Sequence, residues 1–261
     1  MPSLEGRTAI VTGAAGGMGG GITRRFVREG ATVVCVDRED CGERLAELEQ
    51  IRAGAAEAVR LDVRDLAALE RLVDDVVARH GALDVMVNNA GVEQPLMHVV
   101  DTPEDVFREV IDINLWGVVA GCRAAGRVMR EQRSGAVINT ASQLGKVAFA
   151  EWGVYSASKA GVIAISQAMA RELASAGVRV NAVCPGTFDT PLGRRAFTAY
   201  GERDGLTYEQ VRAGYEQTAI GLGRLGSPDE MGALCVFLAS DDASFITGAS
   251  INLTGGEQWF F

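Results

Sequence analysis

Short apolar runs rich in β-branched residues alternate with longer helical stretches along this chain, and this alternation restricts its fold more than any other feature. Most of the runs are apolar at nearly every position, which is typical of strands in a parallel sheet that is covered on both faces. Helices between consecutive strands, joined by right-handed crossovers, give a doubly wound α/β sheet. The sequence therefore predicts a doubly wound parallel sheet in three layers with about seven strands, in segments near Arg7, Ala31, Ala58, Leu83, Gly135, Val178 and Ala249.

Helical patterns occupy the intervals between these runs. After Asp65, an expected N-cap, apolar residues recur at the 3.6-residue spacing of a helix that packs on a sheet. A long helix is predicted over residues 102–132, with Thr102 and Pro103 as its cap and first turn. A second long helix is predicted over residues 152–177, where the final glycine is expected to end it.

No internal repeat, low-complexity tract or linker divides the chain, so residues 1–261 are predicted to form a single domain. A chain of this length can bury a large core without disulfides. The segment at about 187–218 is its least sheet-like part, because it is polar and interrupted by glycines. This segment is interpreted either as a surface excursion or as a mobile cover over a substrate site.

Charge and cysteine content exclude several classes of protein. The net charge of -9 argues against a nucleic-acid backbone as partner, and no apolar run is long enough to cross a bilayer. The beginning of the chain lacks the pattern of a signal peptide. His80 and His98 have no matching set of ligands, so no catalytic metal is predicted. Dispersed cysteines predict reduced thiols in a cytoplasm, packed in the core: Cys35, Cys41, Cys122, Cys184 and Cys235.

A glycine-rich stretch, TGAAGGMGGG, directly follows the first predicted strand. Gly13, Gly17 and Gly19 give the spacing T-G-x-x-x-G-x-G, with Met18 between the last two. Such a turn lets the backbone approach a diphosphate closely, and the helix after it offers free N–H groups and the positive end of its dipole. Its position between a predicted strand and a predicted helix favours a dinucleotide site in a Rossmann fold over a flexible turn without a ligand.

The second predicted strand ends in CVDR, about twenty residues after the glycine turn. There the carboxylate of Asp37 is placed to accept hydrogen bonds from the adenosine ribose and to repel a 2′-phosphate, which favours NAD over NADP. Arg38 beside it weakens this preference, since an arginine can bind that phosphate. Charge and position together indicate that Asp37 decides the cofactor.

The stretch YSASK places Tyr155 and Lys159 four residues apart within the second long helix. Residues at i and i+4 lie on one face of a helix, so the phenol and the ammonium are expected to point the same way. The pattern alone is also consistent with a surface pair on an amphipathic helix. A positive charge about 4 Å from a phenol contributes roughly 4 kcal/mol at an effective dielectric of ~20, enough to bring its pKa toward neutrality.

Further motifs occur in their expected strand and helix places: NNAG at Asn88–Gly91, TAS at Thr140–Ser142 and PGTFDT at Pro185–Thr190. Together with the glycine turn and YSASK, they resemble the motifs of the short-chain dehydrogenase/reductase family in its compact, single-domain form. The resemblance extends from about Arg7 to Gly256, nearly the whole chain.

This resemblance implies an enzyme with a catalytic tetrad formed by Asn114, Ser142, Tyr155 and Lys159. In such a tetrad Tyr155 acts as general base or acid, Ser142 donates a hydrogen bond to the substrate oxygen, and Lys159 also holds the nicotinamide ribose. Asn114 is expected to position a water behind the lysine for proton relay. From the sequence alone, Asn114 is also consistent with a satisfied polar residue in a helix, and Ser142 with a turn former.

The resemblance also implies further cofactor contacts, and the cofactor is predicted to be NAD. Asp62 and Val63 match the positions that contact adenine. Asn89, Ala90 and Gly91 match the wall of the cofactor cleft, and Pro185, Gly186 and Thr190 match the loop that contacts nicotinamide. Asn89 is in addition expected to hold the central strand by hydrogen bonds.

The predicted reaction is transfer of a hydride between NAD and a secondary alcohol or ketone. Residues next to the motifs are candidates to line the substrate pocket: Glu93, Gln94, Gln143, Leu144, Glu151, Trp152, Thr187 and Phe188. Among them, Gln143, Trp152 and Thr187 are predicted to contact the substrate. Because several candidates are polar, a polyol, sugar or hydroxyketone is favoured over a long apolar alcohol.

Two other functions are left open. Reduction of a 3-oxoacyl group on a carrier protein is opposed by Asp37 and by the acidic net charge. A non-catalytic NAD sensor is opposed by the complete tetrad, because a sensor needs no tyrosine base.

The family commonly forms tetramers through long helices like these, so a homotetramer is expected. The chain ends in GGEQWFF, and Trp259, Phe260 and Phe261 are unfavourable to expose together. They are expected either to pack across a subunit interface, near a neighbour's pocket, or to pack locally on their own subunit.

Overall fold

The apolar runs form one parallel sheet of seven strands. The computed structural model describes residues 3–257. The strands are β1 Thr8–Thr12, β2 Thr32–Asp37, β3 Ala56–Arg60, β4 Val85–Asn88, β5 Gly135–Thr140, β6 Val178–Pro185 and β7 Ser250–Leu253. Their order is β3-β2-β1-β4-β5-β6-β7, and every neighbouring pair is parallel. The direction of winding reverses between β1 and β4, so the predicted doubly wound sheet is confirmed.

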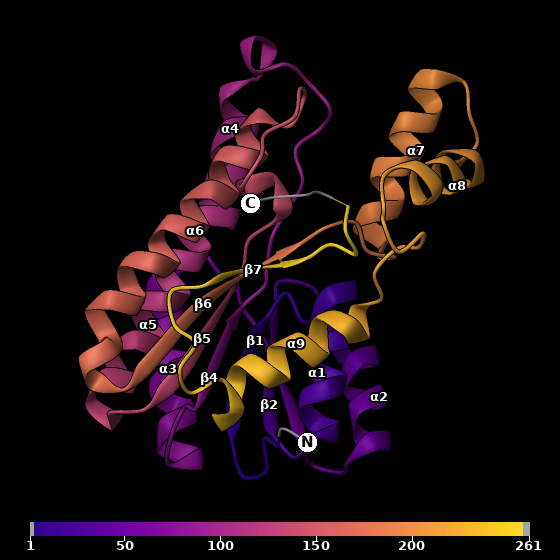
Figure 1. The fold of residues 1–261 in the computed structure, drawn as a ribbon. Helices are drawn as coiled ribbons and strands as arrows, with labels where there is room; N and C mark the ends of the chain where they lie inside the picture. The colour runs from indigo at the N-terminus through magenta and orange to yellow at the C-terminus, as the bar shows by residue number, and fades with distance from the viewer. Residues whose placement is uncertain (1–2, 258–261) are drawn as a thin grey trace.

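Helices cover both faces of the sheet and complete the three layers (Figure 1). One face carries α1 (Gly17–Arg28), α2 (Gly42–Ile51) and α9 (Pro228–Ala239), and the other carries α3 (Leu66–His80), α5 (Gly117–Gln132) and α6 (Gly153–Leu173). Phe26 and Met231 are fully buried on the first side, as is Met129 on the second. Strands β1 and β4 are buried along their whole length, which explains their continuous apolar sequences.

The long helix predicted over residues 102–132 is interrupted. It consists of α4 (Glu104–Ile111), a π-helical turn (Asp112–Trp116) and α5. The prediction of Thr102 as the cap is wrong: Pro103 occupies that position, and the Thr102 hydroxyl donates to the carbonyl of His98 at 3.1 Å. A π-helical turn inside a helix often marks a functional site, and this one contains Asn114.

Other helix ends agree with the predicted caps. At the start of α3, the Asp65 carboxylate accepts a hydrogen bond from the amide of Ala68 at 2.9 Å. α6 passes into a short 3₁₀ turn at Ala174–Ala176 and ends at Gly177, whose φ is +71°. Further 3₁₀ turns lie at Val99–Asp101, Gln143–Gly145 and Asp241–Ala243.

The glycines that follow the glycine turn allow α1 to pack closely against its neighbours. A Cβ atom at Gly21 would lie 2.0 Å from the carbonyl oxygen of Pro228 in α9. One at Gly20 would lie 2.1 Å from the guanidinium of Arg44, which itself donates to the carbonyl of Ala14 in the glycine turn at 3.3 Å. Protein packing therefore explains these two glycines.

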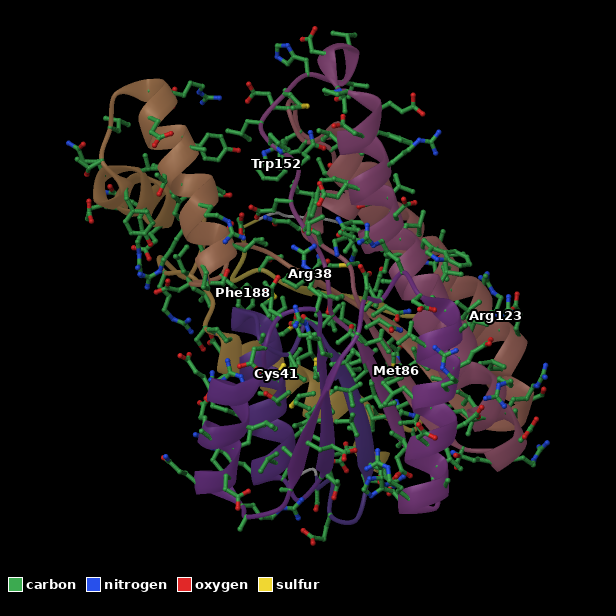
Figure 2. The ribbon with its side chains drawn as sticks, turned by 180° about the vertical axis from the view of Figure 1, so that it is seen from behind. Arg38, Cys41, Met86, Arg123, Trp152 and Phe188 are labelled. Atoms are coloured by element: carbon green, nitrogen blue, oxygen red, sulfur yellow. The ribbon has the colours of Figure 1, made fainter. Side chains whose placement is uncertain are left out.

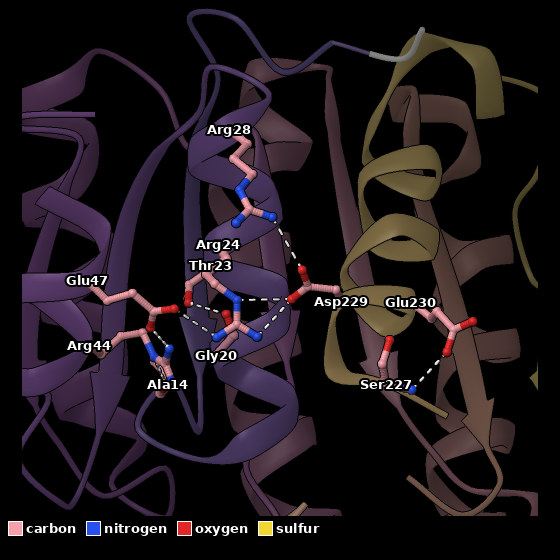
Figure 3. A network of polar contacts seen from close by, with 10 residues as sticks. All are labelled: Ala14, Gly20, Thr23, Arg24, Arg28, Arg44, Glu47, Ser227, Asp229 and Glu230. Carbon is pink, nitrogen blue, oxygen red and sulfur yellow. Dashed lines mark hydrogen bonds and ion pairs between the residues drawn. The ribbon is translucent and has the colours of Figure 1, made fainter. Parts of the chain in front are cut away.

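Ion pairs join the same three helices at the surface (Figure 3). Arg24 of α1 contacts Asp229 of α9 at 2.7 Å and Glu47 of α2 at 3.0 Å. Arg28 adds a second contact to Asp229 at 3.3 Å. The C-terminal half of α1 is thus held from two sides.

The segment at 187–218 contains a pair of helices, α7 (Pro191–Asp204) and α8 (Tyr208–Thr218). Figure 1 shows this α7–α8 pair standing beyond the carboxyl ends of the strands, apart from the two helical layers. Thr190 caps α7 by accepting a hydrogen bond from the amide of Gly193 at 3.1 Å. A small apolar cluster joins Phe197 of α7 to Ile220 and Leu225 in the segment after α8.

The five cysteines are buried, and none forms a disulfide within residues 3–257. In the same range, no helix is long and apolar enough to span a membrane, and no group of three His, Cys, Asp or Glu side chains is arranged to hold a metal ion. Trp259, Phe260 and Phe261 lie outside the described residues.

Candidate active site

One cavity of about 1190 Å³ lies at the carboxyl ends of the strands, beside the α7–α8 pair. It exceeds the ~300–1,000 Å³ of a usual small-molecule pocket, which leaves room for a dinucleotide and a small substrate. Figure 2 labels three lining residues, Arg38, Phe188 and Trp152, which come from the end of β2, the loop after β6 and the start of α6.

Nearly all of the predicted site residues line this cavity. They are Gly13, Gly17, Met18, Gly19, Asp37, Arg38, Asp62, Val63, Asn89, Ala90, Gly91, Ser142, Gln143, Trp152, Tyr155, Lys159, Pro185, Gly186, Thr187 and Thr190. Asn114 is the exception, since it is fully buried behind the wall.

The glycine turn allows a ligand to approach the backbone closely. Gly13 has a φ of +68°, a conformation that residues with a side chain avoid. A Cβ atom at Gly19 would lie 2.0 Å from the carbonyl oxygen of Gly13. Among the described residues, no side chain caps α1, so its first N–H groups can bind an anion. These features fit the diphosphate of a dinucleotide.

Asp37 stands at the end of β2, on the cavity wall. Its carboxylate accepts hydrogen bonds from the amide of Ala15 in the glycine turn at 3.0 Å and from the amide of Glu39 at 3.1 Å. Arg38 is exposed beside it and pairs with Glu39 at 3.4 Å. A carboxylate tied to the glycine turn in this way fits the place where a dinucleotide presents its ribose hydroxyls.

Asp62 and Val63 lie after β3, on the same wall. The guanidinium of Arg64 pairs with the Asp62 carboxylate at 2.5 Å, and this hydrogen bond holds the pKa of Asp62 below its usual range. Val63 is buried against Gly117, where a Cβ atom would come within 2.7 Å of the valine Cγ2. Backbone and apolar surface, and not a free carboxylate, are therefore what this pair offers to an adenine.

Asn89 has the structural role expected of it. Its amide group donates to the carbonyls of Thr12 at 3.0 Å and Gly13 at 3.3 Å. In return, the Thr12 hydroxyl accepts hydrogen bonds from the N–H groups of Asn89 at 2.9 Å and Ala90 at 3.1 Å. These bonds join the ends of β1 and β4, and they fix the glycine turn against the opposite wall of the cleft.

Tyr155 and Lys159 lie on one face of α6, as their spacing predicts. The Lys159 ammonium lies 5.7 Å from the centroid of the Tyr155 ring and donates to the carbonyl of Thr140 at 2.9 Å. Lys159 is only 3% exposed, and this burial lowers its pKa to about 8. The helix and a strand-end carbonyl together hold a cation beside the phenol.

The expected pKa of Tyr155 is wrong for the protein alone. Burial raises the pKa of the phenol above its usual value and the carboxylate of Glu93 raises it further, whereas a hydrogen bond with Ser142 lowers it. The ammonium of Lys159 does not offset this, because burial disfavours its own charge. The described residues therefore keep Tyr155 protonated.

Ser142 and Asn114 support this wall of the cavity. The Ser142 hydroxyl accepts a hydrogen bond from the amide of Leu144 at 3.1 Å and so begins the 3₁₀ turn after β5. The side chain of Asn114 binds both backbone groups of Val92, its Oδ1 accepting from the N–H and its Nδ2 donating to the carbonyl, each at 2.8 Å. Asn114 is thus satisfied within the protein, and its part in proton relay stays a prediction.

Gln94 and Glu151 do not line the cavity, so their prediction as pocket residues is wrong. The Nε2 of Gln94 donates to the carbonyl of Glu151 at 2.8 Å, and its Oε1 accepts from the amide of Tyr155 at 2.7 Å. Gln94 therefore holds the start of α6 in place. Adjacency in sequence failed here because neighbouring side chains point in different directions.

Gln143 and Thr187 line the cavity, but their donor groups bind Glu257, a residue that the sequence analysis missed. The buried carboxylate of Glu257 accepts from the Nε2 of Gln143 at 2.5 Å, and from the amide and hydroxyl of Thr187 at 2.6 and 2.8 Å. It also accepts from the hydroxyl of Tyr215 on α8 at 2.5 Å. Glu257 and Gln143 are 114 positions apart, so no local pattern announces this contact.

Two further contacts connect the α7–α8 pair to the start of α6. The indole N–H of Trp152 donates to the hydroxyl of Tyr200 at 2.7 Å, and the carboxylate of Glu151 pairs with Arg203 at 2.9 Å. Glu151 has a φ of +69°, which is unusual for a residue with a side chain. Trp152 therefore lines the cavity and, among the predicted substrate residues, is bonded to α7.

The cavity geometry agrees with comparisons to known proteins. Residues 13–258 match the family model described as enoyl-(acyl carrier protein) reductase. The L-fucose dehydrogenase of Oryctolagus cuniculus is 40% identical over 255 residues, which cover 97% of this chain and 85% of the relative. The chain belongs to the short-chain dehydrogenase/reductase family.

Other members of the family extend the comparison. The 3-oxoacyl-[acyl-carrier-protein] reductase of Thermotoga maritima is 35% identical over 258 residues, covering 97% of this chain and 98% of the relative. The crystal structure of NAD+-bound xylitol dehydrogenase has a TM-score of 0.89 at 29% identity, and the match covers 97% of this chain and 99% of the other. As a short-chain dehydrogenase/reductase, this chain is an oxidoreductase that acts on CH–OH groups with a nicotinamide cofactor.

Proposed function

We propose that this dehydrogenase transfers a hydride between NAD and a secondary alcohol or ketone, and that its substrate is a polyol, sugar or hydroxyketone. The observation that carries the proposal is the presence of Tyr155, Lys159 and Ser142 in the same cavity as the glycine turn and Asp37. When bound, an oxidised nicotinamide supplies the hydride acceptor and a positive charge. The groups that bind the substrate, orient it, and accept or return its proton are side chains of this chain.

Each side chain of the site has its own role in the reaction. Ser142 donates a hydrogen bond to the substrate oxygen and holds it near the phenol of Tyr155. Tyr155 takes the proton of the alcohol in oxidation and returns it in reduction. Lys159, held by the Thr140 carbonyl, stabilises the tyrosinate and binds the ribose. Because burial and Glu93 raise the pKa of Tyr155, the chain alone favours the acid form of this residue.

The choice of NAD rests on Asp37. Its carboxylate repels the 2′-phosphate of NADP, and its link to Ala15 fixes it beside the glycine turn. The NAD+-bound xylitol dehydrogenase is a structural relative that supports this choice. Arg38 is exposed and paired with Glu39, and this ion pair weakens the attraction of Arg38 for a 2′-phosphate.

The choice of a polyhydroxy substrate rests on the cavity and on the relatives. Glu93 and Gln143 add polar atoms to the wall around Tyr155, where a long apolar alcohol would leave them without partners. Two relatives are named for a sugar and for a polyol, L-fucose and xylitol.

A second candidate is reduction of a 3-oxoacyl group on an acyl carrier protein. The Thermotoga maritima relative favours it, and the description of the family model also names an acyl carrier protein, although for an enoyl substrate. The carboxylate of Asp37 and the net charge of -9 oppose it, because such a partner is acidic and its reductases commonly use NADPH. A non-catalytic NAD sensor is a weaker third, since it needs no tyrosine base.

The proposal extends to the assembly and the cover. We propose a cytoplasmic homotetramer in which the α7–α8 pair opens and closes over the substrate. Trp152–Tyr200, Glu151–Arg203 and Glu257–Tyr215 are the contacts that hold the closed position.

A panel of polyols, sugars, hydroxyketones and a 3-oxoacyl thioester, each assayed at 340 nm with NAD(H) and NADP(H) side by side, tests the proposed function. Turnover of a polyhydroxy substrate with NAD is expected. Exclusive reduction of the thioester with NADPH would establish the second candidate instead. Absence of turnover with every compound would favour the sensor.

A further inference from the structure

The carboxylate of Glu93 faces the cavity without a hydrogen bond or ion pair to any of residues 3–257. The backbone on either side of it is held firmly. Val92 is clamped by the side chain of Asn114 through two bonds of 2.8 Å, and Gln94 is tied to the amide of Tyr155 at 2.7 Å. A fixed, half-buried acceptor with no protein partner is therefore presented next to the reacting groups.

This carboxylate opposes the reaction electrostatically. Its charge raises the pKa of Tyr155, which must lose a proton when an alcohol is oxidised. The other titratable or charged groups that face it are Arg195 and Tyr200 on α7. Burial raises the pKa of Glu93 to about 7, although Arg195 acts in the opposite direction. A contact between this carboxylate and the substrate would offset the raised pKa of Tyr155 that its charge causes.

We infer that Glu93 determines substrate specificity by accepting a hydrogen bond from a second hydroxyl group of the substrate, adjacent to the one that is oxidised. The inference rests on the proposed function and narrows its substrate class to vicinal diols, including sugars and polyols. Above its pKa of about 7, the Glu93 carboxylate is ionised and has only acceptor sites, so it selects a group that carries a donor. Thioesters and simple alcohols have no second donor to offer, and a charged hydrogen bond is about twice as strong as a neutral one.

The test compares pairs of alcohols that differ by one neighbouring hydroxyl. In the simplest comparison, the cis and trans isomers of cyclohexane-1,2-diol are each compared with cyclohexanol. The best alcohol of the panel above and its deoxy analogue form the second. The wild-type enzyme is expected to prefer the diol by about 10- to 100-fold in kcat/KM, the usual effect of a hydrogen bond to a charged group. Glu93→Gln is expected to reduce this preference to a few-fold and to keep activity toward the simple alcohol.

A pH profile separates binding from a merely structural role. Removing the charge of Glu93 lowers the pKa of Tyr155, so the limb on which kcat/KM for the simple alcohol rises with pH moves to lower pH in Glu93→Gln. Loss of structure would instead reduce kcat/KM for both alcohols at every pH. Glu104→Gln is the matched control, because Glu104 is exposed and paired with Arg108 at 2.8 Å. This control should change neither the preference nor the profile.

The outcomes distinguish this inference from the proposed function. Undiminished diol preference in Glu93→Gln would overturn the role of Glu93 and leave the dehydrogenase intact. The same holds if the wild-type enzyme oxidises simple alcohols as well as diols. Absence of turnover with every alcohol and ketone of the panel would instead overturn the proposed function, and this inference with it.

Discussion

The ammonium of Lys159 lies 5.7 Å from the ring centre of Tyr155, one turn along α6, and its hydrogen bond goes to the carbonyl of Thr140. The pair is therefore built into the fold before any ligand binds. Its electrostatics favour a protonated tyrosine, because burial opposes charge on both side chains. A site of this kind is poised to ionise only when further positive charge enters it.

Lys159→Met is expected to raise the free energy of unfolding at pH 7. Burial lowers the pKa of Lys159 from 10.5 to about 8, so the folded state binds the proton less well than the unfolded state does. The destabilisation is complete below pH 8 and disappears as the pH rises toward 10.5. It amounts to about 3 kcal/mol at pH 7, reduced by about 2 kcal/mol for the lost bond from the ammonium to the Thr140 carbonyl.

Denaturant unfolding of both proteins at pH 7 and pH 10 measures this effect. The difference in free energy of unfolding between variant and wild type should shrink at the higher pH. Titration of the tyrosines and cysteines that do not interact with Lys159 occurs in both proteins and cancels in the difference, which leaves Cys184 as the thiol whose pKa the substitution itself changes. A difference that does not depend on pH would show that Lys159 is not destabilised by its burial.

Glu257→Gln is expected to loosen the α7–α8 pair. The amide presents a donor where the carboxylate accepts hydrogen bonds from Gln143, Thr187 and Tyr215. The loss of buried charged bonds costs about 2–3 kcal/mol locally. Faster amide hydrogen exchange in α8 and a higher KM should follow. Tyr215→Phe, which removes one of the bonds, should give a smaller effect in the same direction, and unchanged exchange in Glu257→Gln would rule out the restraint.

Gly21→Ala is expected to destabilise the protein by more than about 3 kcal/mol. Its Cβ atom would lie 2.0 Å from the carbonyl oxygen of Pro228, and backbone on both sides must move to make room. Gly214→Ala in α8 is the matched control, because a Cβ atom there has no neighbour within 4 Å. That control should stabilise its helix by up to about 1 kcal/mol. Thermal unfolding of both variants compares them, and equal effects would mean that α1 and α9 do not pack this closely.

Asp37→Asn isolates the effect of charge on cofactor choice. The amide oxygen can still accept the hydrogen bond from Ala15, but the repulsion of a 2′-phosphate is gone. The preference for NAD over NADP in kcat/KM should fall by about tenfold, equivalent to about 1.4 kcal/mol. An unchanged ratio would move the discrimination to another group, of which Arg38 is the nearest in sequence.

The sheet and the cofactor side of the site could be predicted from the sequence because both depend on local patterns. Continuous apolar runs identify buried parallel strands, and β1 and β4 are indeed buried throughout. The glycine turn, Asp37 and Asn89 each follow directly after a strand. The carboxyl ends of parallel strands meet at one edge of a sheet, which brings such residues into one cavity.

The remaining features depend on contacts that no local pattern encodes. Glu257 meets Gln143 across 114 positions, and the π-helical turn that contains Asn114 has the same apolar periodicity as the helices around it. The pKa of Tyr155 depends on burial and on Glu93, and spacing along a helix reports neither. Polar composition and internal glycines concealed the helices of the α7–α8 pair.

The proposed function is tested most directly by the rate of NADH formation from the best alcohol of the panel by the wild-type enzyme and Tyr155→Phe. The variant should lose about 100- to 10,000-fold in kcat, the usual contribution of a general base, while fluorescence titration shows unchanged binding of NADH. Tyr208→Phe, which changes a tyrosine of α8 that does not line the cavity, should keep most of the activity. Turnover by Tyr155→Phe within a few-fold of the wild-type rate would contradict the role of this tyrosine as the proton acceptor.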